Sequence, residues 1–361
     1  MASATSTRTP WWAWTWPALA LVILGVHAIL NPGAPFAAVE AFALITTVFA
    51  AVYHAEVIAH RVGEPFGTLV LALAVTIIEV ALIVSMMITG GSDTSVLARD
   101  TVFAAVMIVC NGIVGLCLLT GGVRHREQSF QLQGTNAALS VLITLTTLTL
   151  ILPNFTTSTT GPTFSPPQLV FASVVSLILY GSFLFVQTVR HRDFFLPVGG
   201  GGEEEHALPP PNRVALVSAG LLLLSLVLVV LLAKALTPTM ERGIAAVGAP
   251  RGVVGIVIAG LVLLPEGLAA YRAASANRLQ TSMNLALGSA ASIALTIPAV
   301  AGVSITLGRP LTLGLGPKEE LLLMLTLVVS LLTLGTGRTT VLQGMVHLFL
   351  FAVFLFLAVV P

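Results

Sequence analysis

The sequence predicts an all-α protein that crosses a membrane about eleven times. Of its 361 residues, 56% are hydrophobic and 9% are charged, and the mean hydropathy is +1.00. A soluble globular domain carries about 25% charged residues. Apolar stretches long enough to cross about 30 Å of hydrocarbon recur along the whole chain. Short segments containing Pro, Gly, Asn or charged residues separate them, so little of the chain is left for a soluble domain.

Each predicted span ends where a charged or turn-forming residue interrupts an apolar run. Trp11, Trp12, Trp14 and Trp16 precede or begin the first span and are typical of an aromatic anchor at the membrane surface. A cleaved signal peptide is the alternative for this segment, but no convincing small-residue cleavage site follows His27. The predicted spans are residues 16–31, 36–60, 64–90, 98–121, 135–152, 167–189, 213–236, 246–271, 282–306, 318–336 and 340–360.

The distribution of Lys and Arg predicts a protein of the cell (inner) membrane with a cytoplasmic N-terminus and an external C-terminus. In this orientation ten basic residues lie on the inside, namely Arg8, Arg61, Arg124, Arg126, Arg190, Arg192, Arg213, Arg272, Arg278 and Arg338. Six lie on the outside, namely Arg99, Lys234, Arg242, Arg251, Arg309 and Lys318. This moderate excess follows the positive-inside rule.

A polar stretch in the middle of the chain divides it into two halves. Residues 191–212 contain a run of glycines, the acidic run Glu203–Glu205, and His206, which predicts a flexible cytoplasmic linker. A weak site for divalent cations is the alternative. The predicted organisation is an N-terminal segment with a leading helix (1–35), a first repeat (36–190), the linker (191–212) and a second repeat (213–361).

Nucleic acid and a structural zinc ion are not expected as partners. The 16 Lys and Arg residues are balanced by 15 Asp and Glu and form no basic run, whereas a nucleic-acid-binding surface is strongly basic. Cys110 and Cys117 lie seven residues apart in one apolar segment, without the paired Cys/His spacing of a zinc site.

Two glutamates stand at predicted membrane depth, where an ionisable side chain costs about 2.5–3.5 kcal/mol and by default marks a functional site. Glu79 lies in the third span and Glu266 in the eighth, directly behind Pro265. The proline removes a backbone donor, so carbonyls of the preceding turn become available to a cation. No basic residue stands at that depth to neutralise the carboxylates, which argues against a purely structural buried hydrogen bond.

The two glutamates also occupy matching places in the two halves. Five spans separate them, and an odd offset makes their helices run in opposite directions, as in an inverted repeat. The span after each glutamate offers further oxygen ligands for a hard cation, with interhelical packing as the alternative role. These candidate ligands are Asn111 in the fourth span and Asn284, Ser289 and Ser292 in the ninth.

Four other polar residues are candidates for a gate or a proton path. His54, Glu56 and His60 lie near the end of the second span. The spacing of the two imidazoles does not fit a metalloprotease motif, and an ordinary interfacial helix end is the alternative. Glu40, near an outer helix end, is either solvated or part of a vestibule. His347, alone on the last span, is expected to serve packing.

Three stretches carry a resemblance to a known family: GEPFGTLVLALAVTIIEVALI (63–83), LLPEGLAAYRAASANRLQTSMNLALGSAASIALTIP (263–298) and TGRTTVLQG (336–344). The chain resembles the calcium/proton exchanger (CAX) family of the calcium:cation antiporter superfamily, and most of all its bacterial ChaA-type members. The resemblance covers almost the whole chain. It implies one leading helix plus two inverted five-helix repeats, with one essential glutamate per repeat, matching Glu79 and Glu266.

The chain departs from the family pattern around both glutamates. Eukaryotic members have an Asn-Ala-x-Glu context, where this chain has Thr76-Ile77-Ile78-Glu79 and Leu263-Leu264-Pro265-Glu266. Thr76 is therefore the polar candidate ligand that remains beside Glu79. The segment Gly288–Ala290 keeps the GSA pattern of the second repeat. The missing amides leave open whether calcium is the selected cation.

We expect a cation/proton antiporter that works by alternating access, without a cofactor. Hard oxygen ligands without His or Cys favour Ca²⁺, Na⁺ or K⁺ over transition metals. Protons and cations would compete for Glu79 and Glu266, which makes exchange obligatory. A monovalent cation/proton antiporter and a cation channel are the alternatives. An enzyme is not expected, because the sequence has no HExxH motif, nucleophile elbow or paired membrane aspartates.

Overall fold

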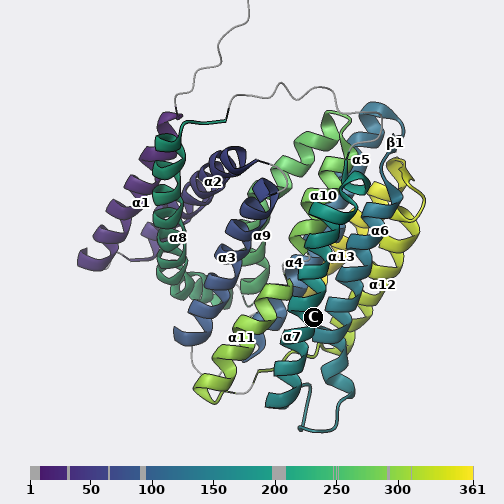
Figure 1. The fold of residues 1–361 in the computed structure, drawn as a ribbon. Coiled ribbons are helices and arrows are strands. Elements are labelled where there is room, and N and C mark those ends of the chain that lie inside the picture. The colour runs from purple at the N-terminus through teal and green to yellow at the C-terminus, as the bar shows by residue number, and fades with distance from the viewer. Residues whose placement is uncertain are drawn as a thin grey trace, which may run out of the picture. The chain divides into compact units, whose positions relative to one another are not determined.

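The structure, a computed structural model, describes residues 9–30, 33–63, 66–89, 95–196, 209–246, 248, 250, 252–290, 293–309 and 311–360. Figure 1 shows that these residues are mainly helical. The helical segments are α1 (Trp11–Leu30), η1 (Ala34–Phe36), α2 (Ala37–Val62), α3 (Phe66–Thr89), α4 (Leu97–Met107), η3 (Ile108–Ile113), α5 (Val114–His125), α6 (Leu132–Thr146), η4 (Thr147–Ile151), η5 (Leu152–Phe155), α7 (Pro166–Phe185), η6 (Val186–Arg190), η7 (Arg192–Phe195), α8 (Asn212–Ala246), α9 (Gly252–Ser275), α10 (Leu279–Ala290), α11 (Ile293–Leu307), α12 (Pro317–Leu334) and α13 (Val341–Val359).

Each of the eleven predicted spans coincides with helical structure in the described residues. Nine of the described segments are long and apolar enough to cross a membrane. The other two predicted spans are α3, with an apolar part described over Leu73–Ile88, and α12, whose first turn carries Lys318, Glu319 and Glu320. The predicted all-α polytopic fold class is confirmed.

Two predicted boundaries differ most from the structure. The seventh span is predicted to end at residue 236, but α8 continues through Pro238 to Ala246. The eighth is predicted to begin at residue 246, but α9 begins at Gly252. A proline removes one backbone hydrogen bond and kinks a helix, and a long helix can continue beyond it.

Contacts between Cα atoms divide the chain into two compact units. Unit 1 is Met1–Ile78 with Glu203–Arg242 and includes α1, α2, the first part of α3 and most of α8. Unit 2 is Glu79–Gly202 with Gly243–Pro361 and includes the remaining segments. Because this division follows contacts and not sequence symmetry, the inverted repeat stays a prediction.

In unit 1, aromatic side chains near the start of α1 pack against α2. The ring centroids of Trp12 and Trp16 lie 4.7 Å apart, and those of Trp12 and Tyr53 lie 5.1 Å apart. Beside them, His54 Nε2 lies 3.0 Å from the carbonyl oxygen of Ala13. The tryptophans predicted to anchor the chain at the membrane surface thus also join the first two helices.

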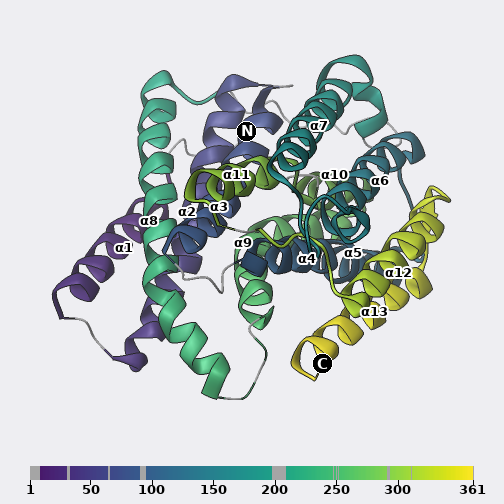
Figure 2. The same cartoon turned by 90° about the horizontal axis from the view of Figure 1, so that it is seen from below.

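In unit 2, the fourth span comprises α4, η3 and α5 and packs against α9 and α13 (Figure 2). Glycines permit the close approach of α5 and α13, because a Cβ on Gly122 would lie 2.7 Å from the Val341 nitrogen. Strand β1 (Gln128–Ser129) pairs antiparallel with β2 (Arg338–Thr339). This short ladder joins the segments that follow α5 and precede α13, and fixes the ends of both helices.

Candidate cation-binding site

The two predicted membrane glutamates belong to unit 2 and lie near each other. Glu79, on α3, is 6% exposed, and Glu266, on α9, is partly buried. Their carboxyl groups are close enough for their charges to interact. Two carboxylates at this depth repel each other unless protons or cations neutralise them. The structure therefore brings together the two carboxyl groups, which the sequence links only through their matching positions in the two halves of the chain.

The backbone beside Glu266 offers a further oxygen. Helix α9 continues through Pro265, which has no N–H to donate. The carbonyl of Leu261, four residues earlier, therefore receives no helical hydrogen bond from Pro265. This carbonyl lies about one helical turn from Glu266. The same part of α9 therefore carries both this backbone oxygen and the carboxyl group.

Ser289 is the predicted ligand that the structure places at Glu266. It lies at the end of α10, and its hydroxyl donates a hydrogen bond to Glu266 Oε2. This bond orients the carboxyl group and adds the hydroxyl oxygen of a third side chain to the four oxygens of the two carboxylates. Ser292, which is predicted to lie on the same span, falls outside the described residues.

The two asparagines use their amides elsewhere. Asn111 donates from Nδ2 to Thr326 Oγ1 at 2.8 Å, and its Oδ1 lies 3.1 Å from His347 Nδ1. Asn284 donates from Nδ2 to the Phe195 carbonyl at 2.6 Å and accepts from Gln280 at 2.8 Å. Both amides thus have partners from the protein itself, and among the described residues neither amide forms a hydrogen bond with Glu266.

Tyr180 is a residue near the site that sequence reasoning missed. It lies on α7, and its side chain is 5% exposed. The phenol group is close enough to interact electrostatically with both Glu266 and Glu79. The signal available in the sequence was a single tyrosine inside an otherwise apolar span, but the sequence did not tell which helices this span contacts.

The four candidates for a gate or proton path all belong to unit 1. His54 is buried against α1, whereas Glu56 and His60 are exposed. Glu40 is 3% exposed, and its Oε1 lies 2.5 Å from His27 Nδ1. Glu40 is therefore not the solvated residue that was one of its two interpretations. Thr76, also of unit 1, is buried on α3 three residues before Glu79.

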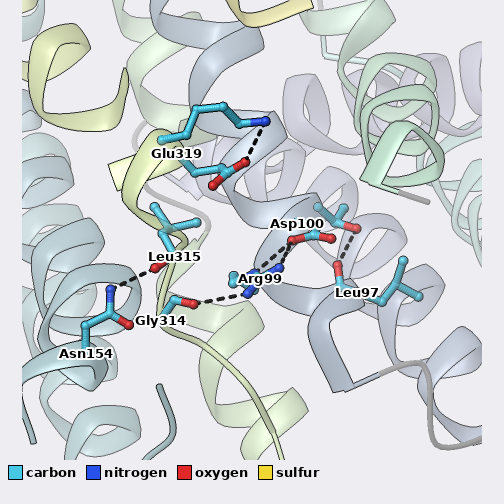
Figure 3. Close-up of polar contacts among 9 residues, drawn as sticks. Leu97, Arg99, Asp100, Asn154, Gly314, Leu315 and Glu319 are labelled. Carbon is cyan, nitrogen blue, oxygen red and sulfur yellow. Dashed lines mark hydrogen bonds and ion pairs between the residues drawn. The ribbon is translucent and has the colours of Figure 1, made fainter. Parts of the chain in front are cut away.

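A second polar cluster of unit 2 lies at the start of α4 (Figure 3). Arg99 contacts Asp100 Oδ1 at 2.8 Å and donates to the Gly314 carbonyl at 3.2 Å. Asn154 donates to the Leu315 carbonyl at 2.8 Å and to Glu320 at 3.0 Å. These bonds attach residues 314–315 to α4 and η5, which is a structural role.

The donor set available to a metal ion is small. Within the described ranges, no three His, Cys, Asp or Glu side chains gather closely enough to hold a metal ion. A cation at Glu79 and Glu266 would therefore take its remaining ligands from hydroxyl groups, backbone carbonyls or water. Such an all-oxygen set is suited to hard cations.

Comparisons with known proteins give a consistent result. Residues 34–189 and 217–360 match the family model described as "Sodium/calcium exchanger protein". The y4hA protein of Sinorhizobium fredii is 51% identical over 360 residues, which are 99% of this chain and 98% of that protein. The sodium-potassium/proton antiporter ChaA of Escherichia coli is 35% identical over 359 residues, 98% of this chain and 97% of that protein.

A solved structure shows the same fold. The crystal structure of the H⁺/Ca²⁺ exchanger CAX superposes with a TM-score of 0.71 at 16% identity, over 95% of this chain and 87% of that one.

Proposed function

Because the chain belongs to the sodium/calcium exchanger protein family, we propose that it is an antiporter that exchanges cations for protons across the cell membrane. The carboxyl pair of Glu79 and Glu266 is the observation that carries this proposal. Two protons or one divalent cation neutralise two carboxylates equally well. The empty site would keep two uncompensated charges in an apolar environment, which is unfavourable. Only an occupied site then crosses between the two sides, so influx of one ion requires efflux of the other.

Ca²⁺ is the proposed substrate, with Na⁺ or K⁺ as further substrates. Two carboxylates, the Ser289 hydroxyl and the Leu261 carbonyl are hard oxygen ligands of the type Ca²⁺ prefers. A monovalent cation/proton antiporter is the second candidate, because Thr76, Ile77 and Ile78 precede Glu79 and provide no amide ligand. One relative is itself named a sodium-potassium/proton antiporter. The activity needs no cofactor and no bond-making chemistry.

The finer topology is also part of the proposal. The excess of basic residues in alternate loops supports an N-terminus in the cytoplasm and a C-terminus outside the inner membrane. In this orientation the His27–Glu40 pair lies at the external ends of α1 and α2. Glu40, His54, Glu56 and His60 are proposed to serve ion or proton access, and residues 191–212 to connect the two repeats in the cytoplasm.

A transport assay tests the proposal directly. The purified protein is placed in proteoliposomes with an acidic interior and an enclosed pH-sensitive dye, and Ca²⁺, Na⁺ or K⁺ is added outside. We expect Ca²⁺ to make the interior more alkaline, at a rate that protein-free vesicles do not reach. Alkalinisation by Na⁺ or K⁺ without Ca²⁺ would favour the monovalent antiporter. Cation entry without proton release would contradict antiport and favour a channel.

The Ser289 hydroxyl provides a graded test of the site. We expect Ser289→Ala to raise the apparent KM for the cation by about tenfold, because a hydrogen bond to a charged group contributes about 1.5–3 kcal/mol. Ser225→Ala is the matched control, since Ser225 is buried on α8 and its hydroxyl has no partner among the described residues. The initial rate of alkalinisation against cation concentration gives both KM values. Equal KM values would show that Ser289 does not serve the site.

A further inference from the structure

Four buried polar side chains of unit 2 form a continuous chain of contacts between η3, α12 and α13, which we call the Asn111 clamp. Its members are Thr326, Asn111, His347 and Thr333. Asn111 Nδ2 donates to Thr326 Oγ1 at 2.8 Å, and His347 Nδ1 lies 3.1 Å from Asn111 Oδ1. The other ring nitrogen of His347, Nε2, lies 2.8 Å from Thr333 Oγ1. All four side chains are buried.

This pattern assigns the hydrogens in the clamp. The amide nitrogen of Asn111 points to Thr326, so its oxygen faces His347 and can only accept. His347 Nδ1 must therefore carry a hydrogen and donate it. Nε2 then faces a threonine hydroxyl, which can donate or accept. Both polar ends of Asn111 and both ring nitrogens of His347 are thereby satisfied, which is what a buried polar network requires. His347, which is expected to serve packing, therefore also forms polar contacts with two other helical segments.

The clamp acts on an unusual piece of backbone. Asn111 lies in η3, a π-helical turn between α4 and α5, and such turns are frequent at functional sites. Packing from α13 supports the same turn, because a Cβ on Gly112 would lie 3.3 Å from the Phe351 ring. The Cβ of His347 itself would lie 2.9 Å from a Cβ on Gly115, one turn further on. Helix α13 thus holds the π-helical turn through both polar and apolar contacts.

The other side of this turn faces the helix of the cation site. A Cβ on Gly267 would lie 3.2 Å from the Ile113 side chain at the end of η3. Gly267 directly follows Glu266 in α9. A shift of the π-helical turn toward α9 would therefore press Ile113 against the backbone that carries the Glu266 carboxyl group. The clamp on one side and Gly267 on the other leave the turn little freedom.

We propose that His347 is a positioning residue for transport: by holding Asn111 in the clamp, it fixes the π-helical turn that sets the place of Glu266. The inference rests on the proposed function. It adds His347, which lies on a different helix from Glu266 and about 80 positions from it in sequence. His347 needs no change of charge for this role. A side chain that donates one hydrogen bond to Asn111 Oδ1 is sufficient.

Three variants and one matched control test this role in the proteoliposome assay. His347→Ala leaves Asn111 Oδ1 without its donor, and Thr326→Val removes the acceptor of the Asn111 amide while keeping the shape of the side chain. We expect each to raise the apparent cation KM at least about fivefold, with a smaller change in maximal rate, because an unsatisfied polar group in the clamp is unfavourable and lets the π-helical turn shift. His347→Asn, which keeps a donor near the Nδ1 position, is expected to stay within about twofold of the wild-type KM.

Thr149→Val is the control, because Thr149 on η4 is equally buried, and its one hydrogen bond to a described residue goes to the Leu145 carbonyl of the preceding helix α6. Its KM is expected to match the wild type. Unchanged KM values in both His347→Ala and Thr326→Val would overturn the inference. The inference would also be overturned if His347→Asn failed to restore the KM and in addition changed the pH profile of transport. That result would mean that the imidazole ring carries protons.

A second readout separates this inference from the proposed function. Ca²⁺ binding to each purified variant in detergent is measured by calorimetry, after size-exclusion chromatography has established that the variant is folded. If the wild type binds Ca²⁺ but moves no protons, the proposed function fails, while weaker binding by Thr326→Val would still support the clamp. If the wild type exchanges ions and every clamp variant binds Ca²⁺ equally well, the clamp alone fails.

Discussion

Glu266→Gln and Glu79→Gln should each reduce cation-driven proton release to the level of protein-free vesicles. Glutamine keeps the size of the side chain but removes its negative charge and its ability to exchange a proton. A site with one carboxylate can no longer be neutralised equally by two protons or by one divalent cation. In Glu266→Gln the hydroxyl of Ser289 also loses its charged acceptor. The measurement is the initial rate of alkalinisation at saturating cation.

The control for these two variants is Glu127→Gln. Glu127 is exposed between α5 and β1, where its Oε1 lies 3.5 Å from Arg338 Nη1. A surface ion pair of this kind contributes little, so transport should be unaffected. Full activity in either Glu79→Gln or Glu266→Gln would exclude the two-glutamate site, even if the protein proves to be an antiporter.

Gly344→Ala should lower the stability of the protein clearly, although it adds only one methyl group. Gly344 lies on α13, and a Cβ there would lie 2.7 Å from the Cα of Leu119 on α5. Because the obstacle is backbone, the two helices must separate. Overpacking of this kind costs about 1–3 kcal/mol and sometimes more. The apparent Tm in detergent, followed by size-exclusion chromatography of heated samples, should fall by several degrees, and the yield of folded protein should drop.

Gly181→Ala is the matched control for this prediction. Gly181 also lies within a helix, α7, but nothing comes within 4 Å of a Cβ placed there. Alanine has the higher helix propensity, by about 1 kcal/mol, so this variant should be as stable as the wild type or slightly more stable. Equal apparent Tm values for Gly344→Ala and Gly181→Ala would mean that α5 and α13 are not held at this close distance.

Some residues of the candidate site can be predicted from the sequence, and others cannot. Glu79 and Glu266 stand out because a membrane span with a single acid is energetically unusual, whatever surrounds it. Ser289 could be proposed because it follows Glu266 by one predicted helix. Tyr180 could not, since nothing in its own span indicates that α7 approaches two carboxylates. Asn111 is predicted from the sequence as a cation ligand, with interhelical packing as the alternative, but its partners His347 and Thr326 are not identified there.

The sequence by itself determined the fold class, the positions of the spans and the two acidic residues within them, because these depend on local composition and on the cost of apolar or charged groups in each solvent. The tertiary structure decided which polar side chains have partners. Contacts such as Asn111–His347 and His27–Glu40 depend on which helix faces lie together. The apolar residues of the spans do not indicate in sequence which helix face meets which. Small residues such as Gly344 and Gly267 allow two particular faces to come close, and this is seen only in the packed structure.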